Sequence, residues 1–258
     1  MKLAAWNVNS LKVRLPQLLD FLATRTPDIV CLQETKLEDV NFPRTELEAA
    51  GYQVVYSGQK TYNGVAILSK APMSEVQIGI PGFGDEQKRV LAASVGDLRT
   101  VCVYIPNGQS VDSDKYRYKL KWLAALTGWL KNELKAYPKL ALLGDYNIAP
   151  EDRDVHDPVL WKDQVLCSEP EREAFRELLG LGLKDSFRLF EQPEKSFSWW
   201  DYRMMGFRRN HGLRIDHILL SDALAASCTE SRIDRDMRKL ERPSDHAPVI
   251  ATIEPPRD

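Results

Sequence analysis

The chain has 258 residues, of which 43% are hydrophobic and 28% are charged, and its 35 Lys and Arg against 37 Asp and Glu leave a net charge of -2. This composition excludes a collagen, a mucin, a coiled coil and a disordered charged tail, and it allows a substantial core. The longest apolar runs, such as Leu140–Leu143 and Ile218–Leu220, are far shorter than the roughly 18 residues that indicate a membrane span. No signal-peptide core forms near the first residues. We therefore expect a cytoplasmic protein without membrane contact.

Apolar segments of strand length alternate with segments of helical spacing, and no low-complexity linker interrupts them. In chain order we expect a strand, a helix, five strands, a helix, a strand, a helix and two strands, over Lys2–Val8, Leu15–Arg25, Ile29–Gln33, Tyr52–Tyr56, Val65–Ser69, Val90–Val95, Thr100–Ile105, Lys115–Lys135, Leu140–Leu143, Glu169–Leu179, Asp216–Ser221 and Val249–Ile253. Pro16 is well placed for the opening turn of the first helix. So many strands with so few helices favour a single α/β domain, residues 1–258, in which helices flank two packed sheets.

The cysteines indicate free thiols. They stand dozens of residues apart without a Cys-x-x-Cys pair, at Cys31, Cys102, Cys167 and Cys228. Two of them lie inside apolar runs, where a buried thiol in a reducing compartment is more common than a zinc site or a disulfide.

Polar side chains follow the predicted strands where each strand ends. Asn7, Glu34, Tyr104 with Asn107, and Asp145 with Asn147 occupy such places, and two acid-histidine pairs, Asp216–His217 and Asp245–His246, lie beside the last two strands. Each residue alone fits a turn, a helix cap or a hydrogen-bonded core position better than a functional one. Together, carboxylates, amides and imidazoles on rigid strand ends favour a site for a divalent cation and a phosphate.

Positive charge is concentrated in three stretches, Lys115–Lys121, Arg203–Arg214 and Arg232–Arg242, although the net charge is close to zero. Each stretch alone is typical of a solvated surface. The three together would suit a localised phosphate-binding face. The sequence has no P-loop, no dinucleotide-binding glycine motif, no nucleophile elbow and no His-Glu-x-x-His motif. An NTPase, a nicotinamide enzyme, a serine hydrolase and a thermolysin-like protease are therefore unsupported.

A series of motifs resembles, in the same order, the exonuclease III family of DNA-repair nucleases. They are Trp6–Leu11, Leu32–Lys36, Asn63–Ile67, Tyr104–Gly108, Gly144–Pro150, Gly212–Asp216 and Ser244–Pro248. The resemblance spans nearly the whole chain and implies the wider endonuclease/exonuclease/phosphatase group, whose fold is a four-layered α/β sandwich with two mostly antiparallel sheets. Three segments look specifically like the DNA-repair branch, namely Gln33–Lys36, Phe197–Arg203 and Gly212–Asp216.

The resemblance also implies a role for most of the strand-end residues. Glu34 would be the principal Mg²⁺ ligand with Asn7 beside it, and Asp145 would orient or deprotonate the attacking water. Asn147 would donate to the phosphate, and Asp216 would fix His246. Tyr104 would act on the phosphate side and Asp245 near the leaving group. A second metal position would use Asp145, Asn147, Asp245 and His246, and Asn9 stands where some relatives carry an Asp. The sequence leaves one or two ions open, with Mn²⁺ able to replace Mg²⁺.

From this resemblance we expect a Mg²⁺-dependent DNA phosphodiesterase of base excision repair. It would incise DNA at abasic sites, act as a 3′–5′ exonuclease that removes 3′ nucleotides and blocking groups, or do both. Its partner would be double-stranded DNA, and it would be a monomeric, bacterial-type cytoplasmic protein associated with the nucleoid through DNA. A phosphatase or phosphodiesterase of a small phosphorylated ligand is the alternative. A non-catalytic DNA-binding module is disfavoured because competent side chains occupy nearly every catalytic position.

Substrate choice would depend on an apolar pocket beside the scissile phosphate. Trp199, Leu213 and Ile215 align with positions that enclose an extruded sugar without its base, and Asn107, Leu213, Trp199 and Arg214 would contact DNA. Adjacent strand residues face opposite ways, so at most one of Trp199 and Trp200 lines the site.

The segment from Glu151 to Glu171 would be the loop that flanks this pocket. Its bulkier residues, such as Trp161 and Leu166, could close the pocket and favour exonuclease action. We expect both activities to coexist.

Overall fold

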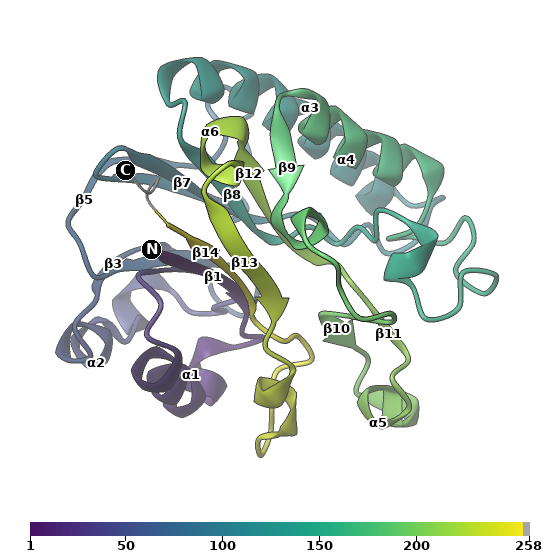
Figure 1. The fold of residues 1–258 in the computed structure, drawn as a ribbon, viewed down its shortest axis with the longest axis horizontal. Coiled ribbons are helices and arrows are strands. Elements are labelled where there is room, and N and C mark those ends of the chain that lie inside the picture. The colour runs from purple at the N-terminus through teal and green to yellow at the C-terminus, as the bar shows by residue number, and fades with distance from the viewer. Residues whose placement is uncertain (255–258) are drawn as a thin grey trace.

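Two six-stranded sheets pack face to face, and helices cover both outer faces in the computed structural model, which describes residues 1–254 (Figure 1). The first sheet has the order β13 (Cys228–Ile233), β14 (Val249–Ile253), β1 (Lys2–Asn7), β2 (Ile29–Gln33), β4 (Val65–Ser69) and β3 (Gln53–Ser57). The second sheet has the order β5 (Met73–Ile78), β6 (Val90–Val95), β7 (Leu98–Tyr104), β8 (Leu140–Asp145), β12 (Asp216–Ser221) and β9 (Leu183–Asp185). The expected four-layered sandwich is confirmed.

The helices are divided between the two outer faces. Helices α1 (Leu11–Arg25) and α2 (Arg44–Ala49) pack on the first sheet, and α3 (Asp114–Ala136) and α4 (Glu169–Gly180) pack on the second (Figure 1). The described chain also has the short elements β10 (Trp199–Trp200), β11 (Gly212–Leu213), α5 (Gly206–Arg209) and α6 (Asp222–Ala225), together with short 3-10 helices. No helix within residues 1–254 is long and apolar enough to cross a bilayer.

The sheets are mostly antiparallel, as expected. Strands β1 and β2 run parallel in the first sheet, β7 and β8 run parallel in the second, and the remaining neighbours are antiparallel. Strands covered on both faces are continuous apolar runs, and every residue of β2, β4, β6 and β8 is buried. Side chains from both sheets, such as Leu3, Ile67, Leu91 and Leu143, fill the space between them.

Most predicted elements are confirmed, and the differences have local causes. The first helix begins at Leu11 rather than Leu15, so Pro16 lies inside it and not in its first turn. Strands β5, β9, β10, β11 and β13 were not predicted. Strands β5, β9 and β13 lie at sheet edges, and β10 and β11 have only two residues each. An edge strand pairs on one side and needs no continuous apolar run. The four cysteines are free, and all but Cys228 are buried.

This topology gathers strand ends at one place. The carboxyl ends of β1 and β2 lie together because these strands are parallel, and the same holds for β7 and β8 in the facing sheet. Strand β12 runs antiparallel to β8 and begins there, with Asp216 opposite Asp145. Residues from both sheets therefore meet at this edge of the sandwich.

Candidate active site

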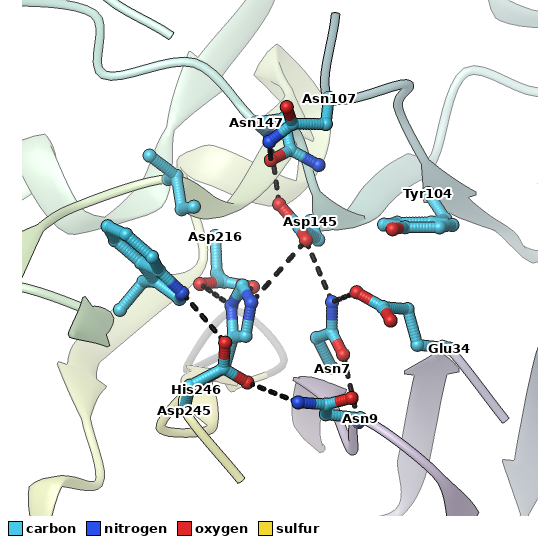
Figure 2. A network of polar contacts seen from close by, with 12 residues as sticks. Asn7, Asn9, Glu34, Tyr104, Asn107, Asp145, Asn147, Asp216, Asp245 and His246 are labelled. Atoms are coloured by element: carbon cyan, nitrogen blue, oxygen red, sulfur yellow. Dashed lines mark hydrogen bonds and ion pairs between the residues drawn. The ribbon is translucent and has the colours of Figure 1, made fainter. Parts of the chain in front are cut away.

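The amide of Asn7 connects the two sheets at the centre of this edge. Asn7 is the last residue of β1 and is fully buried. Its Nδ2 donates to Glu34 Oε1 at 2.9 Å and to Asp145 Oδ2 at 2.8 Å, and its Oδ1 accepts from the Asn9 backbone at 3.0 Å (Figure 2). The expected neighbourhood of Asn7 and Glu34 is present, but Asn7 presents its nitrogen to the carboxylates. In this arrangement Asn7 holds two carboxylates rather than offering an oxygen to a cation.

Glu34 stands on a strained turn directly after β2. Its φ of 51° lies in the left-handed region, which residues other than glycine seldom adopt. The Ser10 amide donates to the Glu34 carbonyl at 2.8 Å and helps to hold this turn. The Lys36 ammonium lies 2.9 Å from Glu34 Oε2 and donates to Asn9 Oδ1 at 2.6 Å. Glu34 therefore projects a partly exposed carboxylate whose charge Lys36 partly offsets.

Asp145 ends β8 and points into the space between the sheets. The strand approaches β7 so closely at Gly144 that a Cβ there would lie 1.9 Å from the Val103 carbonyl oxygen, so the residue before Asp145 has to be glycine. Asp145 Oδ1 accepts from the Asn147 backbone at 2.9 Å. Burial raises the pKa of Asp145 to about 7, although the nearby His246 opposes this shift. A carboxyl group with such a pKa suits proton transfer near neutral pH.

His246 and Asp216 form a buried ion pair beside Asp145. His246 Nδ1 donates to Asp216 Oδ2 at 2.9 Å, and Ser198 Oγ donates to the same oxygen at 2.6 Å. His246 Nε2 faces Asp145 Oδ2 at 3.7 Å. Burial opposes the charge on the imidazole, but Asp216, Asp145 and Asp245 together raise the pKa of His246 to about 10. The imidazole is therefore protonated at neutral pH.

Asp245 joins the site to the short strand β10. Its Oδ1 accepts from Asn9 Nδ2 at 2.9 Å, and its Oδ2 accepts from Trp199 Nε1 at 2.9 Å. Trp199 is half-buried, whereas its neighbour Trp200 is fully buried and packs edge-on against Phe207. One tryptophan of the pair therefore reaches the site, in line with strand alternation.

Asn107, Asn147 and Tyr104 lie on the side of the site formed by the second sheet (Figure 2). Asn107 Nδ2 donates to Asn147 Oδ1 at 3.1 Å, and Asn147 Nδ2 donates to the Ile105 carbonyl at 2.9 Å. The Arg89 guanidinium lies 4.7 Å from the centre of the Tyr104 ring. Burial, followed by the charges of Glu34 and Asp145, raises the pKa of Tyr104 well above its usual value, so the phenol stays protonated.

The donor set fits a hard divalent cation. Glu34, Asp145 and His246 each offer a ligand atom, and these atoms lie within 4.8 Å of one another. The imidazole is committed to Asp216 through Nδ1, so the two carboxylates are the groups suited to Mg²⁺ or a similar ion. We call Asn7, Glu34, Tyr104, Asn107, Asp145, Asn147, Asp216, Asp245 and His246 the polar cluster, and Figure 2 shows them together.

Two predicted DNA contacts lie outside the polar cluster. Leu213 is fully buried in an apolar cluster that also contains Ala149, Val155, Leu166, Cys167 and Ile215, with Trp161, Val165 and Trp199 packed against it. Arg214 is 1% exposed and forms ion pairs with Asp154 and Asp185 at 2.7 and 2.8 Å. Its guanidinium is thus occupied inside the protein and has no surface from which to reach a phosphate.

His217 also has a structural environment. It accepts from Arg214 at Nδ1 and donates to the Ile148 carbonyl at 2.9 Å through Nε2. Burial lowers the pKa of His217 to about 4, and the neighbouring Arg214 adds to this shift. Of the two acid-histidine pairs in the sequence, Asp245–His246 contributes both side chains to the polar cluster, whereas Asp216–His217 contributes only its carboxylate.

Three contacting residues, Asn9, Lys36 and Ser198, were missing from the predicted site. All three lie inside motifs that the sequence had already displayed, Trp6–Leu11, Leu32–Lys36 and Phe197–Arg203. Asn9 and Ser198 bond to partners outside their own motifs, at Asp245 and Asp216, whereas Lys36 pairs with Glu34 two residues before it. The motifs were a usable signal for all three residues, but the partners of Asn9 and Ser198 could not be identified without the fold.

An open groove of about 710 Å³ continues from the polar cluster beyond Tyr104. Aromatic and cationic side chains line it together with amides, and they include Tyr62, Arg89, Asn107, Lys115 and Tyr118. Tyr62 is 68% exposed. The groove therefore offers flat rings and positive charge directly beside the carboxylates.

The sandwich and its polar cluster correspond to a known group of enzymes. The chain belongs to the Endonuclease/Exonuclease/phosphatase family, whose sequence profile matches residues 4–246. It is 38% identical to exodeoxyribonuclease III of Haemophilus influenzae, and the match covers 97% of this chain and 99% of that protein.

Solved structures agree with this assignment. A 3′ phosphatase from Neisseria bound to product DNA hairpin matches with a TM-score of 0.97 and 49% identity, over 98% of this chain and 99% of that one. An AP endonuclease from Archaeoglobus fulgidus matches with a TM-score of 0.95 and 36% identity, over 98% and 99% of the two chains. The expected family, fold and nuclease class are confirmed.

Proposed function

We propose that this chain is a Mg²⁺-dependent deoxyribonuclease that processes 3′ ends of double-stranded DNA and also incises abasic sites more weakly. The observation that carries the proposal is the convergence of two carboxylates, Glu34 and Asp145, with the His246–Asp216 ion pair at facing strand ends. The names of the relatives, a 3′ phosphatase, an AP endonuclease and exodeoxyribonuclease III, support DNA as the substrate. Each of these reactions hydrolyses a phosphate ester.

The residues of the polar cluster divide the work of such a hydrolysis. Mg²⁺ held by Glu34 would supply a Lewis acid that offsets the charge of the phosphate. Asp145, with a pKa of about 7, orients the attacking water and takes its proton. The protonated His246 stabilises the negative charge that develops on phosphate oxygens, and Asp216 keeps its ring in place.

Asn147 and Asn107 lie on the side opposite His246, and each would donate to a phosphate oxygen through the amide hydrogen that is not already bonded to Ile105 or to Asn147. The protonated phenol of Tyr104 is a further donor on that side. Both oxygens of Asp245 already accept from neutral donors, Asn9 and Trp199. We therefore propose one ion, at Glu34, and a leaving-group role for Asp245 through a bound water.

The substrate would lie over two surfaces next to the polar cluster. One is the groove beside Tyr104, whose rings and cations suit bases and phosphates. The other is the turn between β10 and α5, where Met204 and Met205 are 77% and 53% exposed and hold left-handed φ angles of 57° and 52°. Arginines follow them in α5, and apolar wedges next to cations are typical of proteins that open a minor groove.

The remaining expectations stay part of this proposal. Residues 1–258 would form one catalytic domain that acts as a monomer, and the protein would work in the cytoplasm of a bacterium, bound to the nucleoid through DNA. The family profile, which extends from residue 4 to residue 246, supports a single domain.

One assay tests the proposal against its alternative. The purified chain would receive a duplex with a 3′ phosphate, a duplex with a recessed 3′ end, an abasic duplex and an inositol phosphate, each with Mg²⁺, with Mn²⁺ and with EDTA. We expect metal-dependent release of phosphate and nucleotides from the DNA 3′ ends and slower incision of the abasic duplex. Release from the inositol phosphate alone would replace the proposal by the small-ligand phosphatase.

A further inference from the structure

A buried ion pair lies directly behind the phosphate side of the polar cluster. Lys119 from α3 and Glu171 from α4 are both 0% exposed, and their side chains contact each other. From its place in the basic stretch Lys115–Lys121, Lys119 was expected to be a surface cation. Burying an ammonium and a carboxylate is costly, and apolar side chains of the same size would stabilise a core at least as well. A fully buried pair therefore calls for a reason other than stability.

All three donors of the Lys119 ammonium are in use. Besides Glu171, it donates to the Asn147 carbonyl at 2.6 Å and to the Asn107 carbonyl at 3.1 Å. These are the two residues whose side-chain amides meet on the phosphate side of the cluster. Asn147 has a φ of 50°, a left-handed conformation that needs support from its surroundings. One ammonium thus fixes the main chain beneath both amides.

Glu171 extends the same node to the loop between β8 and α4. Its Oε1 also accepts from the Leu166 amide at 3.0 Å, and its Oε2 accepts from Ser168 Oγ at 2.6 Å. Ser168 Oγ in turn is 2.6 Å from the hydroxyl oxygen of Tyr116 on α3. Leu166 belongs to the apolar cluster beside the site. The node therefore connects the amide pair to the segment that borders the substrate from the other side.

We propose that Lys119 and Glu171 are positioning residues for phosphate ester hydrolysis, holding Asn107 and Asn147 in place through their backbone carbonyls. The inference rests on the proposed function of the polar cluster. Because the amides act on the charge that develops during the reaction, a loss of their position lowers kcat while KM changes little.

The test compares Lys119→Met with the double variant Lys119→Met/Glu171→Gln. Methionine keeps the length of the side chain without its charge, and leaves Glu171 buried without a cation. We expect Lys119→Met to lower kcat on a 3′-phosphorylated duplex by about 10-fold to 100-fold, with KM within about threefold. The same variant should lose roughly 10 °C in Tm. The double variant removes the buried charge, so it should regain Tm, while kcat stays low because the two carbonyls still lack their donor.

Arg99 provides a matched control. It is a 3% exposed cation that joins the sheet to α3 through Glu133 at 2.8 Å, at the opposite end of β7 from Tyr104. Arg99→Met should lower Tm and leave kcat unchanged. A kcat that recovers together with Tm in the double variant, or that falls equally in Arg99→Met, would overturn the inference. An inactive wild-type chain would instead remove the proposed function, and the inference with it.

Discussion

The polar cluster and the apolar cluster beside it meet at Trp199, but different forces organise them. In the polar cluster each contact joins one donor to one acceptor, as between Asn7 and Asp145 or between His246 and Asp216. In the apolar cluster, residues such as Leu166, Leu213 and Ile215 fill space with side chains that have no directional partners. Hydrogen bonds require particular residue types at fixed positions, whereas packing requires only a suitable volume.

We infer from this contrast that the polar cluster carries out the reaction and that the apolar cluster determines which substrates fit. A substitution in the polar cluster changes the reaction itself, because a neighbouring residue cannot take over a directional contact. A substitution in the apolar cluster changes which DNA ends fit, because it alters the shape of the wall. We therefore expect large losses on all substrates from the first region and smaller, substrate-dependent changes from the second.

The largest effect is expected at Asp145. Asp145→Asn removes the group proposed to take the proton of the attacking water, a contribution that is typically ~10² to 10⁴-fold. Turnover should fall by about that range on 3′ ends and on abasic duplex alike, and DNA affinity should be equal or higher because a negative charge near the phosphate is gone. Single-turnover kinetics and fluorescence anisotropy measure the two quantities. Asp97→Asn, at an exposed carboxylate, serves as control, and near wild-type turnover in Asp145→Asn would reassign the role.

The substitution Glu34→Gln should abolish tight metal binding without affecting the stability of the fold. Glu34→Gln keeps the size of the side chain, so the Tm should stay close to that of the wild type. Calorimetry should detect one Mg²⁺ per wild-type chain and no tight binding in the variant, with activity reduced by about 10² to 10³-fold. Glu38→Gln, an exposed neighbour, should bind Mg²⁺ like the wild type. Unchanged affinity in Glu34→Gln would remove this carboxylate from the metal site.

His246 and Asp216 should behave as one unit. Asp216 is proposed to act only through the imidazole that it holds, so His246→Ala and Asp216→Ala should each lower kcat. The kcat of the double variant should be no lower than that of the less active single variant. The coupling energy from this cycle should be roughly 1 to 3 kcal/mol. The pair His246→Ala and His217→Ala is the control, because His217 bonds to Arg214 and Ile148 instead. Strictly additive losses for His246 and Asp216 would contradict the coupling.

The same contrast explains how much of the fold the sequence could predict. Buried strands such as β2 and β8 are unbroken apolar runs, so their pattern follows from burial on both faces. The edge strands β5 and β13 were missed because half of their surroundings is solvent. The end of each buried strand could nevertheless be located in the sequence by the polar residue that follows its apolar run. The parallel pairing of β1 with β2 places two of these ends side by side.

For the site, the sequence motifs identified the main polar residues. They did not show which cationic side chains are buried against acidic partners far away in sequence. Glu34, Asp145 and His246 were identified and the fold brings them together. Arg214 and Lys119 were expected on a basic surface, yet both are buried with acidic partners that lie 60 and 52 residues away. A run of positive residues shows only the local composition. Whether one of these cations is buried depends on which carboxylates the fold places beside it. This is why the DNA-contacting role of Arg214 had no structural counterpart.

Leu166 is the place where the apolar cluster is most open to alteration. It is 4% exposed and packs with Leu213 and Ile215, so the region that could enclose an extruded sugar is filled by its side chain. Its φ of 76° lies in the left-handed region, where glycine is comfortable and leucine is strained. Replacing it with glycine therefore relieves the backbone while removing four carbons from the wall of the pocket.

Leu166→Gly should change selectivity with the smallest loss of overall activity. An emptied pocket admits a deoxyribose without its base, so incision of abasic duplex should rise by about 10-fold relative to trimming of a 3′ end, since filling or emptying a pocket by a few carbons typically changes discrimination by 10-fold to 200-fold. The ratio of kcat/KM on the two substrates measures the effect. Leu160→Gly, at a 65% exposed position of the same loop, should leave the ratio unchanged.

Trp199→Ala offers the opposite test, because it removes a wall of the pocket together with the hydrogen bond to Asp245. It should reduce incision of abasic duplex more than trimming of a 3′ end. Equal changes on both substrates in Leu166→Gly and Trp199→Ala would mean that the apolar cluster supports the fold alone and that selectivity resides in the groove beside Tyr104.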